Sequence, residues 1–293
     1  RNSGVLHAGF YYAEDSLKAR FCVEGNRAIK QFCQEHSLKI NECGKLVVAK
    51  DEVELETLRE LEHRGNINGA GTELISEAEA REIDPNVKTF ARALWSPHTA
   101  TVDPLEVLLK LQEILSEKGV NFIFGKRVRG FSKGTVTSNK GNRYSSGYFI
   151  NAGGLYADQI AQECGYADNY TIIPFKGIYL KYTSEKPFLR TNVYPVPNLL
   201  NPFLGIHWTV TTNGEAKLGP TSMPAFWREN YAGFDGFNLK ESIPVLYHEA
   251  RLFIQNKFNF RALAFHEMKK YLMKNLVAES QKLVHEKVYS SFT

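Results

Sequence analysis

A helix followed directly by a short apolar run constrains the fold of this chain most strongly. Asp103 can cap the helix, Pro104 suits its first turn, and Glu106 completes a capping box. Gly119 ends the helix, and the run Val120–Phe124 is apolar and too short to be another helix. The segment therefore predicts a helix and then a buried strand, which is half of a βαβ unit.

Other segments extend this pattern along the chain. Helices are predicted over 15–36, 52–64, 76–83 and 239–292, and strands over 45–50, 127–131, 134–138 and 144–150. The proline-broken stretch 170–220 is rich in Tyr, Val, Ile and Thr, which predicts an antiparallel sheet. The predicted fold class is α/β, of the mixed α+β kind.

Composition and charge exclude several classes of protein. The chain has 293 residues, 43% of them hydrophobic and 23% charged, as in a folded globular protein of two intertwined domains or one large domain. Its net charge is +4 without a long basic block, so nucleic-acid binding is not indicated. No apolar run approaches the roughly 18 residues of a membrane span.

Cysteine usage bears on metal binding and location. The chain has 4 cysteines, and no two are spaced as CxxC, so a metal site is not indicated. Sparse cysteines in a long chain are typical of reduced thiols, which predicts a cytoplasmic protein.

A glycine pair near the middle of the chain is the first candidate for ligand binding. Gly153 and Gly154 follow the predicted strand and precede a helix, an order that suits an anion at the helix start. The same order also arises where a helix packs tightly on its sheet, and no GxGxxG occurs.

Two histidines and two cations are the other candidates. His7 lies in a glycine-containing opening segment, and His207 lies on a predicted strand among aromatic residues. Lys176 and Arg228 are cations set among aromatic residues and can bind carboxylates. Each of these residues could instead have only a structural role. The lysines of the C-terminal helix predict a solvated face that could touch acidic lipid.

Several motifs, taken together and in order, resemble the L-2-hydroxyglutarate dehydrogenase/oxidase family of the FAD-dependent D-amino-acid oxidase-like superfamily. The motifs are RNSGVLHAGFYY at the start, Cys43-Gly-Lys, Thr101-Val-Asp-Pro104, Asn151-Ala-Gly-Gly154, Pro174-Phe-Lys-Gly177, Tyr194-Pro-Val-Pro197 and Phe203-Leu-Gly-Ile-His207. The resemblance covers nearly the whole chain. It implies that the chain corresponds to the central part of such an enzyme, without the GxGxxG that precedes these motifs and the flavin-binding segment that follows them. Position 1 is Arg where many members have His.

The resemblance implies an incomplete FAD-binding Rossmann-like domain interleaved with an antiparallel-sheet substrate domain. The first would comprise residues 1–40 and 101–168, and the second residues 41–100 and 169–293. It also implies which residues contact the cofactor and the substrate. FAD would contact Asn2, Ser3, Gly4, Val5, His7, Val128, Ala152, Gly153 and Gly154. The substrate would contact Lys176, Tyr179, Tyr194, His207 and Arg228.

The implied reaction is oxidation of L-2-hydroxyglutarate, or a related 2-hydroxy acid, by hydride transfer to FAD. A base must take the hydroxyl proton, and His7 and His207 are both candidates because a neutral imidazole suits that task near pH 7. The electron acceptor would be a quinone or oxygen, and peripheral contact with the inner face of a membrane is compatible with the sequence. Two alternatives stay open: an amine or amino-acid oxidase of the glycine oxidase type, and a truncated product that holds no FAD.

Overall fold

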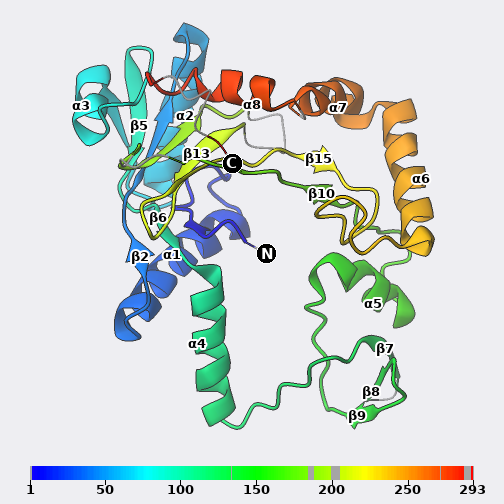
Figure 1. The fold of residues 1–293 in the computed structure, drawn as a ribbon. Helices are drawn as coiled ribbons and strands as arrows, with labels where there is room; N and C mark the ends of the chain where they lie inside the picture. The colour runs from blue at the N-terminus through cyan, green and yellow to red at the C-terminus, as the bar shows by residue number, and fades with distance from the viewer. Residues whose placement is uncertain are drawn as a thin grey trace. The chain divides into compact units, whose positions relative to one another are not determined.

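The computed structural model describes residues 2–132, 134–183, 188–198, 205–270, 272–286 and 292. The chain forms two compact units, which are described separately (Figure 1). The first unit comprises Arg1–Ile114, Gly177–Ser222 and His266–Thr293, and the second comprises Leu115–Lys176 and Met223–Phe265. These units differ from the domains implied by the sequence, because residues 1–40 and 41–100 lie in the same unit. The implied domains therefore stay a prediction.

A 7-stranded sheet forms the centre of the first unit. Its strands, from one edge to the other, are β11 (Leu180–Lys181), β14 (Ala216–Gly219), β13 (His207–Val210), β12 (Asn192–Pro195), β3 (Lys45–Val48), β5 (Arg92–Ser96) and β4 (Glu73–Ser76). Strands β11 to β14 pair antiparallel, as predicted, and β12 pairs parallel with β3. The parallel pair joins two distant parts of the chain in one sheet.

Both faces of this sheet are buried, which explains why β3 has the continuous apolar pattern of a central strand. Leu46 and Val48 belong to one apolar cluster, which includes residues of α8 (Met273–Ser280). Val47 belongs to the other cluster, which includes residues of α2 (Glu52–Ile67). Because side chains alternate along a strand, Lys45 shares its face with Val47.

A small sheet carries the start of the chain. Its order is β1 (Val5–Leu6), β6 (Ala100–Val102) and β2 (Ile40–Asn41). Helix α1 (Leu17–Glu35) follows the opening segment, and Ser16 caps it. Helix α4 (Pro104–Glu117) begins at the predicted proline.

The second unit contains the predicted meander and several short elements. Strands β7 (Val128–Ser132), β8 (Thr135–Ser138) and β9 (Arg143–Ser145) form a 3-stranded sheet (Figure 1). The other elements are a 3₁₀ turn (Gly154–Tyr156), α5 (Ala157–Glu163), β10 (Phe175–Lys176), its partner β15 (Met223–Pro224), α6 (Leu239–Gln255) and a 3₁₀ turn (Lys257–Asn259). Helix α7 (Phe260–Lys269) continues into the first unit.

Three predictions of secondary structure are wrong. The run Val120–Phe124 forms no strand, and the side chain of Phe124 is 72% exposed. Residues 148–150 are not a strand either. A strand needs a neighbour for its backbone hydrogen bonds, and no described strand pairs with these runs. The C-terminal helix ends at Ser280 and residues 281–286 are not helical, whereas 287–291 and 293 lie outside the described residues.

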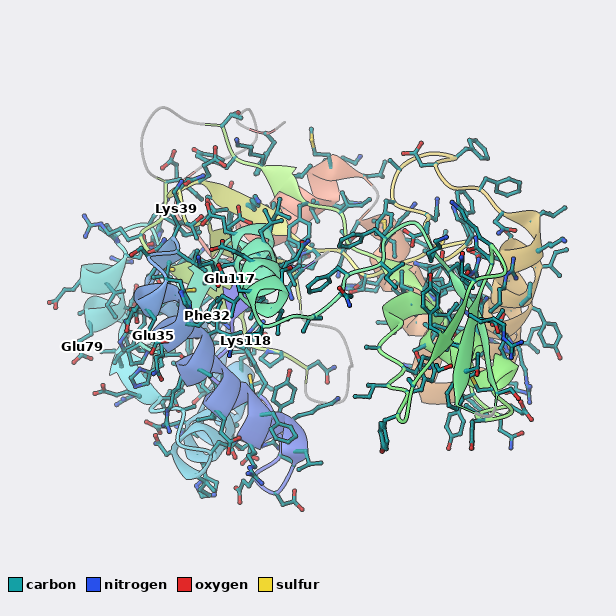
Figure 2. All side chains as sticks on the ribbon, turned by 90° about the horizontal axis from the view of Figure 1, so that it is seen from below. Phe32, Glu35, Lys39, Glu79, Glu117 and Lys118 are labelled. Carbon is teal, nitrogen blue, oxygen red and sulfur yellow. The ribbon has the colours of Figure 1, made fainter. Side chains whose placement is uncertain are left out.

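The capping box that opens α3 (Glu77–Ile83) is confirmed. Ser76 Oγ accepts a hydrogen bond from the Glu79 backbone N–H at 3.3 Å, and Glu79 Oε2 accepts one from the Ser76 N–H at 2.7 Å. Glu79 is labelled on this helix in Figure 2. The Ser76 hydroxyl therefore satisfies a helix N–H that has no partner within the helix.

We expect Ser76→Ala to lower the free energy of unfolding by about 1 kcal/mol, because the N–H of Glu79 loses its acceptor. Urea unfolding of the two proteins measures the difference. Ser76→Thr keeps the hydroxyl and should retain most of the stability. An equal loss in both variants would show that the cap is not the cause.

Candidate active site

Lys45 is a buried cation at the first position of β3. Its side chain is 0% exposed, and it points to the same face of the sheet as Val47. Among the described residues no carboxylate forms an ion pair with it, and none is among the groups that shift its pKa. A buried ammonium group without a carboxylate partner is rare. The groups that surround the Lys45 amine in place of a carboxylate therefore characterise this site.

A histidine and three aromatic rings surround the Lys45 amine. Nζ lies 3.0 Å from Nδ1 of His7. It also lies 4.1 Å from the ring centroid of Tyr194, 5.2 Å from that of Tyr11 and 5.4 Å from that of Phe10. Cation–π contacts of this kind can offset part of the cost of burying the charge.

Asn26 of α1 holds the backbone that carries His7. Its Nδ2 donates to the carbonyl oxygens of Leu6 at 3.0 Å, His7 at 3.3 Å and His98 at 3.0 Å. The side chain of Asn26 is buried, so these bonds are shielded from water. The position of His7 is thus fixed by a helix that lies outside the sheet.

His207 joins the cluster from β13. Its ring stacks on Tyr194 with the centroids 3.7 Å apart and an angle of 18° between the planes. Its Nδ1 lies 2.8 Å from the carbonyl oxygen of Gly205. The sequence separates His7 and His207 widely. The 7-stranded sheet places His207 beside Tyr194, and the segment after β1 places the ring centroid of His7 6.4 Å from that of Tyr194.

The surroundings keep both histidines neutral near pH 7. Burial lowers the pKa of His7 well below its ordinary value, and the charges of Lys45 and His207 lower it further. Burial lowers the pKa of His207 to about 3, with a further contribution from Lys45, against the opposing hydrogen bond to Gly205. Two neutral imidazoles next to one buried amine can exchange or share protons with a bound group.

The same burial weakens the basicity of the lysine. It lowers the pKa of Lys45 to about 7, although the thiols of Cys22 and Cys43 act in the opposite direction. Lys45 therefore changes its charge in the range in which the protein would work.

We expect Lys45 to make stability depend on pH. The folded protein releases the Lys45 proton near pH 7, whereas the unfolded chain keeps it to about pH 10.5. Between these values the unfolded state binds more protons, so the contribution of Lys45 to stability rises with pH, by up to about 1.4 kcal/mol per pH unit. Below about pH 7 both states are protonated and the full burial cost remains.

The measurement is the free energy of unfolding of the wild type and of Lys45→Met from pH 6 to pH 10. The free energy of unfolding of the wild type minus that of Lys45→Met should rise with pH in this window. Both proteins share the thiols of Cys22 and Cys43, whose pKa values burial raises, so the comparison largely removes their effect. A constant difference would contradict the shifted pKa of Lys45.

Tyrosine hydroxyls add hydrogen-bond donors to the cluster. Burial raises the pKa values of Tyr194 and Tyr11, so both remain protonated at neutral pH. The Tyr11 hydroxyl oxygen is buried and has no hydrogen-bond partner among the described residues. A buried hydroxyl without a partner costs free energy, which a bound acceptor would recover.

The opening segment, which carries His7, leads into the cluster. Gly4 has φ +81°, and a Cβ at this position would lie 2.5 Å from the carbonyl oxygen of Val102, so only glycine fits. Asn2 and Ser3 are exposed, and their side chains accept hydrogen bonds from the N–H groups of Gly4 and Val5. Their contact with a cofactor stays a prediction.

The predicted cofactor residues Val128, Ala152, Gly153 and Gly154 lie in the second unit. A Cβ on Gly153 would lie 2.5 Å from Ile160 Cδ1, which supports the alternative of tight packing for this glycine. Gly154 has φ +54° and open space beside it. Val128 begins β7, and Ala152 is exposed. A role of the four in FAD binding stays a prediction.

The predicted substrate residues fall into two groups. Tyr194, His207 and the 41% exposed Tyr179 lie in the first unit, and Tyr179 contributes to the raised pKa of Tyr194. Lys176 and Arg228 lie in the second unit. Lys176 Nζ donates to Asn230 Oδ1 at 3.2 Å and is half-buried, so its role in binding substrate stays a prediction.

The structure places Arg228 in a buried ion pair. Its guanidinium donates to both carboxylate oxygens of Asp158, at 2.8 and 2.7 Å, and to the carbonyl oxygen of Leu155. The side chains of Arg228 and Asp158 are 6% and 5% exposed. The charge of this guanidinium is already paired in the folded protein, and its contact with substrate stays a prediction.

Lys45 is the residue that interpretation of the sequence missed. The segment 45–50 predicts only a strand, and Cys43-Gly-Lys contributes only to the family resemblance. The signal that could have revealed the site is a lysine at the start of an apolar strand that is buried on both faces.

Metal-ligand clusters and membrane-spanning helices are absent from the part of the chain that the structure describes. The described residues contain no group of at least 3 His, Cys, Asp or Glu that could bind a metal. No helix among them is long and apolar enough to cross a membrane. The 4 cysteines are free thiols. Of the C-terminal lysines, Lys270 is not solvated, because it is buried in an ion pair with Glu267 at 2.5 Å.

Comparisons with known proteins agree with the fold. Glycine oxidase from Geobacillus kaustophilus has a TM-score of 0.64 at 18% identity, over 85% of this chain and 66% of that one. L-alpha-glycerophosphate oxidase from Mycoplasma pneumoniae, solved with FAD bound, has a TM-score of 0.64 at 23% identity, over 76% and 60% of the two chains. The chain therefore shares the fold of these two oxidases, and the α/β prediction is confirmed.

Sequence comparison identifies the family. The model of the DAO family, described as FAD dependent oxidoreductase, matches residues 1–257, so the chain belongs to this family. L-2-hydroxyglutarate dehydrogenase of Escherichia coli K12 is 33% identical over 250 residues, which are 84% of this chain and 59% of that protein. The human mitochondrial enzyme of the same name is 34% identical over 251 residues, 80% and 54% of the two chains. The resemblance drawn from the motifs is confirmed, and the chain spans a little over half the length of these relatives.

The cluster around Lys45 fits the cofactor of this family. It offers N–H and O–H donors, one buried cation and a Tyr11 hydroxyl without a partner among the described residues, and none of their carboxylates acts on the pKa of Lys45 or His207. Such a site suits a group rich in acceptors on which negative charge develops, and the flavin ring is such a group.

Proposed function

We propose that the protein oxidises L-2-hydroxyglutarate, or a closely related 2-hydroxy acid, to the 2-oxo acid with FAD as the oxidant. The observation that carries the proposal is the pairing of two neutral histidines with a buried lysine in a chain of the DAO family. The names of the similar E. coli and human proteins support the choice of substrate. A quinone or oxygen would then take the electrons.

The residues of the cluster divide the chemistry between them. FAD, when bound, accepts the hydride from the carbon that bears the hydroxyl group. One of the two imidazoles, His7 or His207, takes the hydroxyl proton, because both are neutral near pH 7. Lys45 supplies the positive charge that an anionic substrate and a developing negative charge require.

The charge of the substrate also makes the imidazole a stronger base. The carboxylates of the substrate bring negative charge, which raises the pKa of a nearby imidazole and favours its protonated form. The low pKa of His207 keeps the base unprotonated until the substrate arrives. The imidazole in the cluster therefore becomes a stronger proton acceptor when the substrate binds.

The test is anaerobic flavin bleaching with a panel of substrates. The full chain is purified with FAD, its flavin absorbance is recorded, and L-2-hydroxyglutarate, D-2-hydroxyglutarate and glycine are added in turn. We expect flavin absorbance in the purified protein and bleaching by the L-isomer. Bleaching by amino acids alone would replace the proposal, and a protein that takes up no FAD would overturn it.

An amine or amino-acid oxidase of the glycine oxidase type is the second candidate. The fold shared with the glycine oxidase from Geobacillus kaustophilus favours it, although that likeness shows the fold alone. A neutral imidazole can accept a proton from a substrate ammonium group as well as from a hydroxyl. The same panel separates the two candidates.

A further inference from the structure

The neighbours of the two histidines determine which ring nitrogen carries the proton. A neutral imidazole has one N–H donor and one acceptor nitrogen, and the group bonded to one nitrogen fixes the role of the other. The two histidines have different neighbours at Nδ1, an amine in one case and a carbonyl oxygen in the other.

His7 faces a donor at Nδ1. The Lys45 ammonium group has N–H donors and no lone pair, and its Nζ lies 3.0 Å from His7 Nδ1. Nδ1 must then accept the hydrogen bond, and the ring proton of the neutral imidazole lies on Nε2. His7 can therefore offer a donor to a bound group, and its Nε2 has no lone pair with which to accept a proton.

His207 faces an acceptor at Nδ1. The Gly205 carbonyl oxygen can only accept, and it lies 2.8 Å from His207 Nδ1. The ring proton of His207 therefore lies on Nδ1, and Nε2 keeps a free lone pair. The stacking of the ring on Tyr194 fixes its plane.

We propose that Lys45 is a positioning residue that assigns opposite roles to the two histidines, so that His207 is the base and His7 is a hydrogen-bond donor. The proposal rests on the proposed function for the identity of the reaction. In that reaction the O–H and C–H bonds of the substrate alcohol would break and its C=O bond would form, with the proton bound at His207 Nε2 and the hydride accepted by FAD. His7 Nε2–H would be left to donate a hydrogen bond to a bound group.

The titratable groups that face Lys45 support this assignment. They are His7, His207, Cys22, Cys43, Tyr11 and Tyr194. Burial raises the pKa values of these thiols and tyrosines, so they are neutral at neutral pH. Of these neighbours, only His7 Nδ1 lies within hydrogen-bond distance of Nζ among the described residues.

The test reads the tautomers directly. The full chain is labelled with ¹⁵N at its 8 histidines, and two-bond ¹H–¹⁵N spectra are recorded at about pH 6, where Lys45 is charged. His7→Gln and His207→Gln identify the two sets of signals. We expect the Nε2–H tautomer for His7, in excess by about fivefold or more for a hydrogen bond worth about 1 kcal/mol, and the Nδ1–H tautomer for His207.

Lys45→Met tests the role of the lysine, with Lys39→Met as the matched control. Lys39 is an exposed lysine of the same unit and is labelled in Figure 2. We expect Lys45→Met to abolish the Nε2–H preference of His7 and to leave the tautomer of His207 unchanged, whereas Lys39→Met changes neither.

Several results would overturn the proposal. These are an Nδ1–H tautomer for His7, an Nε2–H tautomer for His207, or an unchanged His7 in Lys45→Met. If Lys45→Met does not fold, the wild-type spectrum alone still decides the assignment. The spectra need neither FAD nor substrate, so their result is independent of the substrate panel that tests the proposed function.

Discussion

Replacing His207 with glutamine is expected to lower kcat for L-2-hydroxyglutarate by about 10²–10⁴-fold, the usual contribution of a general base. Glutamine keeps the polarity and approximate size of the side chain but cannot accept the hydroxyl proton. KM should change little, because the loss falls on the transition state more than on substrate binding. Stopped-flow measurement of flavin reduction in the FAD-loaded protein gives the rate.

Two further variants serve as a comparison and a control. His7→Gln keeps an N–H donor, so we expect a smaller loss of kcat than in His207→Gln. His266→Gln changes an exposed histidine of α7 and should leave the rate unchanged. Equal losses in His7→Gln and His207→Gln, or a larger loss in His7→Gln, would contradict the assignment of His207 as the base.

Replacing Arg228 with methionine is expected to lower the free energy of unfolding by about 3–5 kcal/mol at pH 7, because the buried carboxylate of Asp158 loses its partner. Burial alone would raise the pKa of Asp158, and hydrogen bonds from Arg228 and the Ile172 N–H lower it below its ordinary value. The pair therefore stabilises the protein above the ordinary pKa of aspartate, and this stabilisation is lost as the pH falls through the lower pKa.

Denaturant unfolding of Arg228→Met at pH 7 and at about pH 4 tests this explanation. The loss should be smaller at the lower pH, because Asp158 without its partner takes up a proton there. Arg251→Met changes an exposed arginine of α6 and should change stability by no more than about 0.5 kcal/mol. The double variant Arg228→Met/Asp158→Leu should recover most of the loss, since it leaves no unpaired charge. A loss that is equal at both pH values would contradict the role of the ion pair.

Local signals in the sequence correctly predicted the elements with caps and regular apolar spacing. Ser76 with Glu79 and Asp103 with Pro104 mark helix starts within a few residues, so interactions among neighbours decide them. The apolar run Val120–Phe124 was mistaken for a strand because an apolar pattern does not tell whether a partner strand exists.

In the candidate site, too, local sequence signals indicate some residues and only the tertiary structure shows others. Both histidines and Tyr194 could be singled out from their motifs, but His207 meets Tyr194 through the antiparallel pairing of β13 with β12, and His7 comes from the segment after β1, which belongs to another sheet. The parallel pairing of β12 with β3 joins two further segments that lie far apart in the chain. That pairing also places Lys45 beside Tyr194, which no local pattern indicates. Arg228 has the sequence context of a substrate ligand, and only its contact with Asp158 shows that its charge is already used.

The sequence by itself indicated the α/β class, the family and the two histidines as candidate bases, because these depend on residue types and on spacings along one stretch of chain. Only the tertiary structure decided which cation belongs to the site and which nitrogen of each histidine can accept a proton. The physical reason is that charge burial and hydrogen-bond direction depend on which groups meet in space, and the sheet brings together groups that lie far apart in the sequence.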